Sequence, residues 1–315
     1  MMTVWREISE HATRLALRRL IAAYLIISGC ALLFPHRSEG WLPLILLHFA
    51  GVVLLVQPSP VRAVYRRAAG SLPRVAGVVA DWYALALMPF LYLEVATVNA
   101  AVYGGRYFDD WIQGLELWLF GGQPSRDLAA TFSSSVVSEV LHACYLSYYL
   151  IIFGPPLYLY LRHRIVDHQR VVFALMLAFL GHYLVFIFFP VQGPRYLFPP
   201  PGGELSQGIM YRLAHAVLEA GSSRGAAFPS SHVGVAVVQT AMAFLVWRRA
   251  APVLVVATAG LGLGAVYGGF HYAIDAVCGL LLGLMLFAVG PRVAGVLGRG
   301  GGGGGSAGDR EPFSG

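Results

Sequence analysis

The chain has 315 residues, of which 57% are hydrophobic and only 12% are charged. A soluble domain of this length needs a more polar surface, so the composition excludes an ordinary soluble protein and indicates one solvated mainly by lipid. The formal net charge of +6 comes from 22 basic residues, all of them arginine. These arginines are scattered over separate connecting segments, which argues against nucleic-acid binding.

Eight apolar runs follow one another along the chain, and most approach the roughly 20 residues that a helix needs to cross the hydrocarbon core. They lie near 16–34, 41–57, 76–98, 136–161, 171–190, 229–247, 252–270 and 272–296. The sequence therefore predicts an all-α, polytopic integral membrane protein with about eight transmembrane helices. The second and seventh runs are short, so a hairpin in place of either crossing is the alternative.

The arginines alternate between the two sides of this predicted topology. With the N-terminus in the cytoplasm, sixteen arginines lie in cytoplasmic segments and six lie in segments on the opposite side. This bias follows the positive-inside rule. It predicts that both termini are cytoplasmic, in a bacterial inner membrane or a plasma membrane.

Segments outside the runs also carry structural signals. Aromatic and apolar residues within 99–135 predict a short helix at the membrane interface, and residues 205–220 form an amphipathic stretch. The glycine-rich tail from Leu297 cannot bury a core and is predicted to be disordered. Glycines at 260, 264 and 268 predict a close helix contact, which would draw the eighth helix toward the sixth.

The first segment with chemical potential is Phe228-Pro229-Ser230-Ser231-His232, at the start of the sixth run. Proline suits the first turn of a helix, and the free N–H groups of a helix N-terminus favour an anion. His232 would lie beside a phosphate bound there and could protonate a leaving oxygen.

The second segment is Phe270-His271-Tyr272-Ala273-Ile274-Asp275, at the start of the eighth run. His271 and Asp275 are four residues apart, so they share one helical face. A carboxylate near one imidazole nitrogen fixes the tautomer and leaves the other nitrogen free as a nucleophile.

The predicted topology brings these segments together. The chain between His232 and His271 is long enough to cross the membrane and return, and Arg195 follows the fifth run on the same side. The arginine is well shaped to hold phosphate oxygens. Each residue alone could be a helix-end histidine or a surface arginine, but the joint pattern predicts a phosphate site facing away from the cytoplasm.

Glu139 and His142 lie three residues apart at the start of the fourth run. They face the same way on a helix. Two interpretations remain open: the pair binds a polyol head group, or it forms a structural hydrogen-bonded pair.

Three segments together resemble the motifs of the type 2 phosphatidic acid phosphatase superfamily. They are Gly193-Pro194-Arg195, Phe228-Pro229-Ser230-Ser231-His232 and His271-Tyr272-Ala273-Ile274-Asp275. With Leu119-Phe120-Gly121-Gly122-Gln123-Pro124 upstream, they look most like the inositol phosphorylceramide synthase branch, the aureobasidin-resistance proteins. Sphingomyelin synthases share the same set of two histidines and one aspartate. The resemblance covers roughly 76–296 and implies a six-helix catalytic core, with two additional helices in 1–75 and the tail in 297–315.

The resemblance also implies residue roles. His271 would attack phosphorus, Asp275 would orient it, and His232 would protonate the leaving group. Arg195, with the backbone near Ser230 and Ser231, would hold the phosphoryl oxygens. No metal or cofactor is implied.

The motifs depart from the phosphatase pattern in ways that bear on the substrate. That pattern has a lysine where this chain has Phe188 and an arginine where it has Ala265; related branches place an arginine where it has Gly269. Arg195 is the only cation that the motifs supply, although Arg212 or Arg224 could reach the site. A singly charged phosphodiester suits such a site better than a dianionic monoester.

Three functional hypotheses follow. The first is a phosphotransferase that moves a phosphoinositol-like head group from a phospholipid donor to a lipid hydroxyl, such as that of ceramide or diacylglycerol. The second is a lipid-phosphate or isoprenyl-pyrophosphate phosphatase. The third is a lipid transporter, against which the placement of the charged groups near one membrane face argues.

Overall fold

The computed structural model describes residues 2–36, 40–56, 70 and 73–299. Within these residues the chain is all-α, as predicted, and its β-type pairing is limited to an isolated bridge between Val191 and Ala226. The expectations for the glycine-rich segment 300–315 lie outside the described residues, as do those for Arg37, Arg62, Arg66, Arg67 and Arg310.

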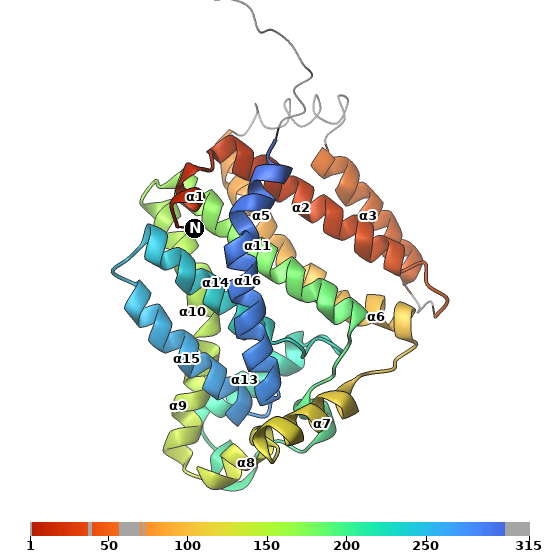
Figure 1. Ribbon diagram of the computed structural model, residues 1–315, viewed down its shortest axis with the longest axis vertical. Coiled ribbons are helices and arrows are strands. Elements are labelled where there is room, and N and C mark those ends of the chain that lie inside the picture. Colours follow the sequence, from red (N-terminus) through yellow and green to blue (C-terminus); the bar gives the residue numbers. More distant parts are fainter. Residues whose placement is uncertain (1, 37–39, 57–69, 71–72, 300–315) are drawn as a thin grey trace, which may run out of the picture.

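Long helical segments pack into one bundle (Figure 1), and in the described part of the chain they match the predicted runs in order. They are α2 (Glu10–Ala31), α3 (Trp41–Val56), α5 (Pro73–Leu93), α9 with α10 (Ser135–Leu146 and Tyr148–Leu161), α11 (Ile165–Phe188), α14 (Ser231–Val246), α15 (Ala251–Tyr267) and α16 (Ala273–Leu297). Among the described helices, α5, α9–α10, α11 and α16 are long and apolar enough to cross a membrane, and α3, α14 and α15 are shorter apolar helices. The protein is therefore a polytopic membrane protein, and the second and seventh runs form single helices.

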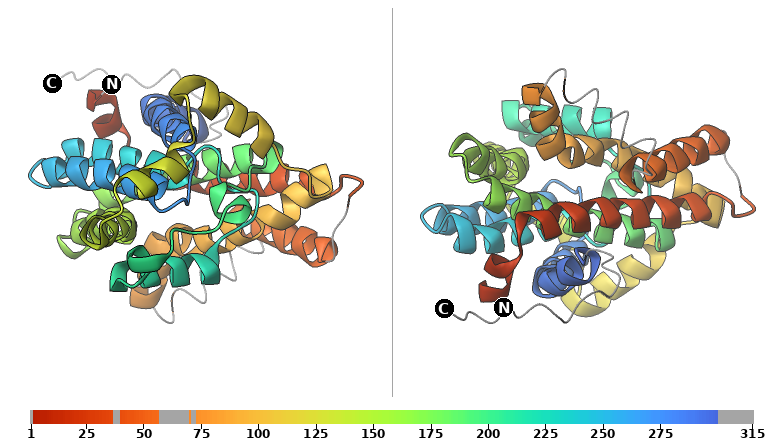
Figure 2. Two further views of the ribbon diagram at one scale, coloured as in Figure 1. Left: turned by 90° about the horizontal axis from the view of Figure 1, so that it is seen from below. Right: turned by 90° about the horizontal axis from the view of Figure 1, so that it is seen from above.

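Helix α11 is the central element of the bundle. It packs against α2, α5, α10, α14 and α16, and the views along the bundle show the other helices around it (Figure 2). Its side chains are apolar on all sides and most are buried, including Phe173, Phe179 and Phe186. A helix that is apolar all round is stable only when it is enclosed, which fits this position.

Helices α14 and α16 approach each other through glycine. A Cβ atom on Gly279 would overlap the carbonyl oxygen of Ser230, and one on Gly283 would overlap that of Gly234. Small residues allow this backbone contact between membrane helices. The contact places the start of α16 against the start of α14, where two of the predicted motifs lie.

The glycines at 260, 264 and 268 make a different contact from the one predicted. A Cβ atom on Gly264 would overlap the carbonyl oxygen of Leu141, and Gly260 lies against Cys144. This stripe therefore packs α15 against α9 rather than drawing α16 toward α14. The helical spacing of the glycines indicated a close contact, but it carried no information on which neighbour would make it.

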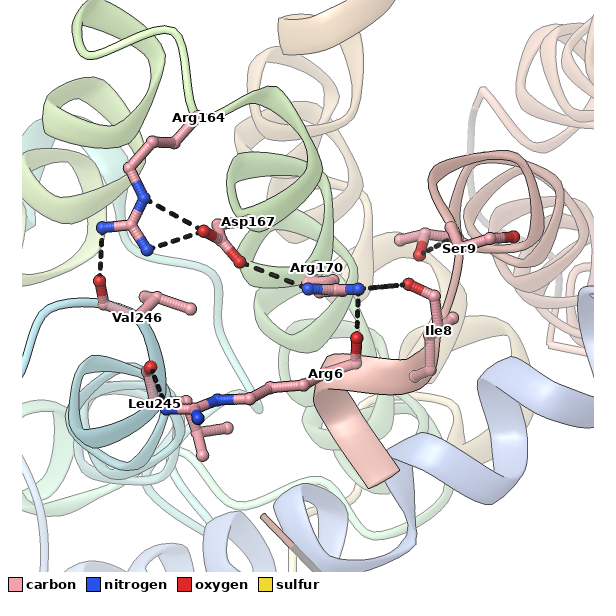
Figure 3. Close-up of polar contacts among 9 residues, drawn as sticks. Arg6, Ile8, Ser9, Arg164, Asp167, Arg170, Leu245 and Val246 are labelled. Atoms are coloured by element: carbon pink, nitrogen blue, oxygen red, sulfur yellow. Dashed lines mark hydrogen bonds and ion pairs between the residues drawn. The ribbon is translucent and has the colours of Figure 1, made fainter. Parts of the chain in front are cut away.

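Arginines satisfy carbonyl groups at one end of the bundle, which we call the α1 end after helix α1 (Met2–Glu7). Arg6 donates to the carbonyl of Leu245 at 3.0 Å, and Arg164 donates to that of Val246 at 2.6 Å and to Asp167 (Figure 3). These carbonyls are the last two of α14, which have no partner within the helix. Arg19 acts in the same way on Leu297 at the end of α16. The guanidinium fork can bridge such acceptors, which gives the exclusive use of arginine a structural role.

Short helices cover the opposite end of the bundle, which we call the α7 end. They are α6 (Val95–Tyr103), α7 (Asp109–Phe120), α8 (Pro124–Thr131), α12 (Pro194–Leu197), the 3-10 helix η1 (Gly203–Ser206) and α13 (Ile209–Gly221). Figure 1 shows α7 and α8 lying across this end, where α16 begins. The helices predicted within 99–135 and 205–220 are thus present as α7 and α13.

Candidate active site

The two histidines of the motifs occupy the starts of two neighbouring helices at the α7 end. His232 is the second residue of α14, whose N-cap Ser230 accepts a hydrogen bond from the N–H of Val233. His271 lies in the turn before α16, whose N-cap is Tyr272. Close packing of α14 on α16 therefore brings together side chains that are 39 residues apart.

The hydrogen bonds of His271 define its tautomer. Its Nδ1 atom lies 3.0 Å from the carbonyl oxygen of Ala227 and 3.4 Å from Oδ2 of Asp275. Both partners are acceptors, so Nδ1 carries the proton and Nε2 keeps its lone pair. The sequence pointed to Asp275 at this nitrogen; the structure adds Ala227 as the nearer acceptor.

The same reasoning about donors and acceptors assigns the tautomer of His232. Its Nδ1 atom lies 3.3 Å from Nε2 of His271, so it is the donor of this pair. Its Nε2 atom then accepts from the hydroxyl of Tyr145, at 3.2 Å. The three side chains form one directional relay, from the hydroxyl of Tyr145 through His232 to Nε2 of His271.

Arg195 lies beside this relay. Its Nη1 atom donates to the hydroxyl of Ser222 at 3.0 Å, and the hydroxyls of Ser222 and Tyr196 lie 2.8 Å apart. The guanidinium of Arg224 lies 5.1 Å from the centre of the Tyr196 ring, on which Arg195 also packs. Of the two extra arginines considered from the sequence, Arg224 is therefore near the site.

Arg212 occupies a different position. It is exposed on α13, and its Nε atom donates to the carbonyl of Gly208, one turn earlier on the chain. It lines neither of the two cavities described next.

A small cavity joins the three motifs. It has a volume of about 30 Å³ and is lined by Arg195, His232 and His271 together with Tyr145, Ser222 and Phe270. Across it, Nε2 of His271 and Nδ1 of His232 are in contact at 3.3 Å, so a phosphoryl group can lie between them only after the two rings separate. A larger cavity of about 590 Å³ adjoins it and shares Arg195 and Tyr196.

His215 and Arg126 are among the residues that line the larger cavity. Burial lowers the pKa of His215 to about 4, and the neighbouring His142 and Arg195 act in the same direction. This imidazole is therefore neutral at physiological pH and adds a polar but uncharged group beside the site.

Four further residues singled out in the sequence have other contacts. Ser230 caps α14 with its hydroxyl and donates its own N–H to the carbonyl of Asp275 at 2.9 Å. Ser230 and Ser231 are buried and do not line the small cavity. The structure brings neither serine to a position from which it faces that space.

Glu139 and His142 serve the packing of α13. The carboxylate of Glu139 accepts from the N–H groups of Met210 and Tyr211, both at 3.1 Å, and so caps the start of that helix. His142 is fully buried, and its Nδ1 atom lies 2.7 Å from the carbonyl of Ser138. Of the two interpretations left open by the sequence, these contacts favour the structural one, although the two side chains do not bond to each other.

Tyr145 was missed by sequence reasoning. Tyr145 follows His142 by three residues, so a helical reading of that segment places its hydroxyl on the same face. A scan for polar groups on that face would have found it. Among the described residues, no cluster of three or more His, Cys, Asp or Glu side chains is arranged to hold a metal ion.

Comparison with known proteins identifies the family of the chain. A family model described as the PAP2 superfamily matches residues 110–289, more than half of the chain, and the match includes Arg195, His232, His271 and Asp275. No curated protein and no solved structure matches the chain.

Proposed function

Because the chain belongs to the PAP2 superfamily, whose members are phosphatases or phosphotransferases, we propose that this membrane enzyme moves a phospho-head group from a phospholipid to a lipid hydroxyl. The observation that carries the proposal is the cavity shared by His232, His271 and Arg195, with the lone pair of His271 Nε2 directed at His232. The reaction would pass through a phosphohistidine on His271.

The first half of the reaction breaks the bond between phosphorus and the lipid alcohol. Nε2 of His271 attacks phosphorus, and its Nδ1–H remains bonded to Ala227 and Asp275, which stabilise the positive charge that develops on the ring. Arg195 holds two phosphoryl oxygens. For this step His232 carries a proton on both ring nitrogens; the departing alcohol oxygen takes one of them, which leaves a neutral ring ready to act as a base.

The second half reverses these steps with a new alcohol. His232 takes the proton of an acceptor hydroxyl, whose oxygen attacks phosphorus as the bond to His271 Nε2 breaks. The products are the new phosphodiester and the original state of both histidines. A ceramide or diacylglycerol hydroxyl is the acceptor that we propose, and a phosphoinositol-like group is the head group.

The paucity of cations at the histidines supports a phosphodiester donor. Phe188 and Ala265 occupy two positions where the phosphatase pattern has a basic residue, and Ala265 is fully buried among apolar neighbours. Among the described residues, Arg195 is the one cation that lines the small cavity. A single guanidinium matches the single negative charge of a diester.

A lipid-phosphate or isoprenyl-pyrophosphate phosphatase is the second candidate, because Arg224 packs on the same Tyr196 ring as Arg195 and could help neutralise a more highly charged substrate. A lipid transporter is the least favoured. The candidate site lies at one end of the bundle rather than at its middle, where a transporter binds its cargo.

We also propose the orientation and division of the chain. The arginine-rich α1 end would face the cytoplasm, with both termini, and the α7 end would face the opposite side of a bacterial inner membrane or a plasma membrane. The segment 76–296 would form the catalytic core, and 1–75 would add two helices whose role lies outside the chemistry.

The test uses the purified protein in lipid nanodiscs with a panel of phospholipids labelled in the head group. Each donor is supplied with ceramide, with diacylglycerol or with neither, and products are identified for the wild type, His232→Ala and His271→Ala. We expect an acceptor-dependent product that both substitutions abolish. Release of inorganic phosphate from phosphatidic acid as the sole reaction would replace the transferase with the phosphatase, and full activity in His271→Ala would exclude both.

A further inference from the structure

Helix α7 has two unlike faces. Asp109, Ile112 and Glu116 follow at spacings of three and four, and all three are buried, with exposed fractions of 5%, 0% and 0%. Trp111 and Trp118 on the other side are 60% and 78% exposed. In a helix at a membrane interface, aromatic side chains of this kind lie among the lipid head groups. The two buried carboxylates therefore need polar partners inside the protein.

Asp109 finds its partners in the segment that leads to Arg195. Its Oδ2 atom accepts from the N–H of Gln192 and its Oδ1 atom from the N–H of Gly193, both at 2.9 Å. Gly193 has a φ of +89°, a conformation that side chains disfavour, and it directly precedes α12, which carries Arg195. The carboxylate thus fixes the backbone at the bend that aims the guanidinium.

Glu116 finds its partner in the segment that follows His271. Its Oε1 atom accepts from the N–H of Ala273, the first residue of α16, at 2.5 Å. The first N–H groups of a helix lack partners within it, so a buried carboxylate there fixes the helix start. The hydroxyl of Tyr272, between His271 and Ala273, also lies 3.3 Å from Oδ1 of Asp109.

We propose that α7 is a clamp whose two buried carboxylates set the position of Arg195 relative to His271. One helix face holds the Arg195 segment through Asp109 and the His271 segment through Glu116 and Tyr272. The inference rests on the proposed function, because it assigns Arg195 and His271 to one reaction. Asp109 and Glu116 line neither of the two cavities and act as positioning residues.

A purely structural role for Asp109 would involve the same hydrogen bonds. The test must therefore measure whether the effect of changing Asp109 depends on the presence of Arg195. Asp109→Asn keeps one acceptor and points an amide donor at the second N–H, which loosens the bend. Asp110→Asn, on the exposed neighbour, is the matched control. Each substitution is made in the wild-type chain and in Arg195→Ala, and kcat and KM are measured in nanodiscs for each protein.

If Asp109 acts through Arg195, the effects of Asp109→Asn and Arg195→Ala on kcat are not additive. Misplacing a catalytic group by about 1 Å can lower a rate on the order of 100-fold. We therefore expect Asp109→Asn to lower kcat roughly 10- to 100-fold in the chain with Arg195 and less than about threefold in Arg195→Ala. An equal loss in both backgrounds would overturn the clamp. If Asp109→Asn does not fold, Tyr272→Phe takes its place in the same cycle, with a several-fold loss expected only beside Arg195.

The Glu116 arm compares two substitutions at one position. Glu116→Gln keeps an acceptor for Ala273 and should retain most activity, whereas Glu116→Ala removes it and should lower kcat by roughly tenfold or more. Equal activity of the two variants would remove Glu116 from the proposal.

A binding measurement separates failure of the clamp from failure of the proposed function. Orthovanadate, an analogue of the phosphoryl group in transfer, should raise the melting temperature of the wild type, and Asp109→Asn should weaken its apparent affinity while Asp110→Asn should not. Vanadate binding that depends on Asp109, in a protein inactive on every lipid tested, would support the clamp and reject the reaction. Vanadate binding that is indifferent to Asp109 would overturn the clamp.

Discussion

Replacing Tyr145 with phenylalanine removes a single hydroxyl from the relay and leaves the ring in place. The ring packs on His232 and Phe270, with centroid distances of 5.2 and 4.6 Å, and those contacts do not involve the hydroxyl. The hydroxyl donates to Nε2 of His232, which keeps the proton of that ring on Nδ1, opposite His271. Tyr145→Phe therefore tests whether the tautomer of His232 matters to the reaction.

The size of the effect follows from the bond that is lost. A hydrogen bond between neutral groups contributes about 0.5–1.5 kcal/mol, and about 1.4 kcal/mol changes a rate tenfold. We expect Tyr145→Phe to lower kcat roughly two- to tenfold with KM nearly unchanged, whereas loss of a general acid such as His232 should lower kcat about 100-fold or more. Initial rates over a range of donor lipid concentrations, in nanodiscs, provide both constants.

Two outcomes would refute the reasoning. A loss as large as that of His232→Ala would mean that the Tyr145 hydroxyl itself transfers a proton. Unchanged rates would mean that the relay does not set the tautomer of His232. A melting temperature within a few degrees of the wild type is the control for folding.

Three further predictions concern the framework. Gly279→Ala should push α16 away from Ser230 and lower both the melting temperature and the activity, whereas Gly295→Ala, where the same helix faces open space, should change neither. Arg164→Lys loses the fork that bridges Val246 and Asp167 and should lower unfolding stability by about 1 kcal/mol, measured by denaturation in detergent. Burial raises the pKa of Glu116 from 4.5 to about 7. The folding stability that the protonated side chain contributes is therefore fully present below about pH 4.5 and is lost as pH rises through about 7. Between pH 5 and 8 the melting temperature of the wild type should therefore fall more than that of Glu116→Gln; parallel curves would contradict this.

The helices could be predicted from the sequence because their main determinant is local. Crossing a hydrocarbon core requires an apolar run of a set length, and α11 and α16 show such runs without reference to any neighbour. The boundaries were less certain: α2 begins at Glu10, six residues before the predicted run, because Ser9 caps it and Arg14 pairs with Asp81 inside the bundle.

The candidate site residues were also accessible from the sequence, because each motif combines a helix start with a side chain of defined chemistry. Their supporting groups were not. Ala227 contacts His271 through a backbone carbonyl, which every residue possesses. Asp109 contacts a backbone 83 residues away, and no local pattern encodes that distance. One signal was present: Asp109 and Glu116 are two helical turns apart and so share one face of an interfacial helix, which points either to water or to partners inside the protein.

The closed state of the site indicates which side chain must move to admit a substrate. Nε2 of His271 and Nδ1 of His232 lie 3.3 Å apart, and a phosphoryl group has to separate them. His271 is held by Ala227 and Asp275, and its helix is fixed to α14 at the backbone through Gly279. On its other side the ring of His232 has one hydrogen bond, from the hydroxyl of Tyr145, and packs against the rings of Tyr145 and Tyr148. We therefore expect the ring of His232 to move while the rest of the site stays in place, and a structure with orthovanadate bound should show the Ala227 contact of His271 kept and the contact between Nδ1 of His232 and Nε2 of His271 broken.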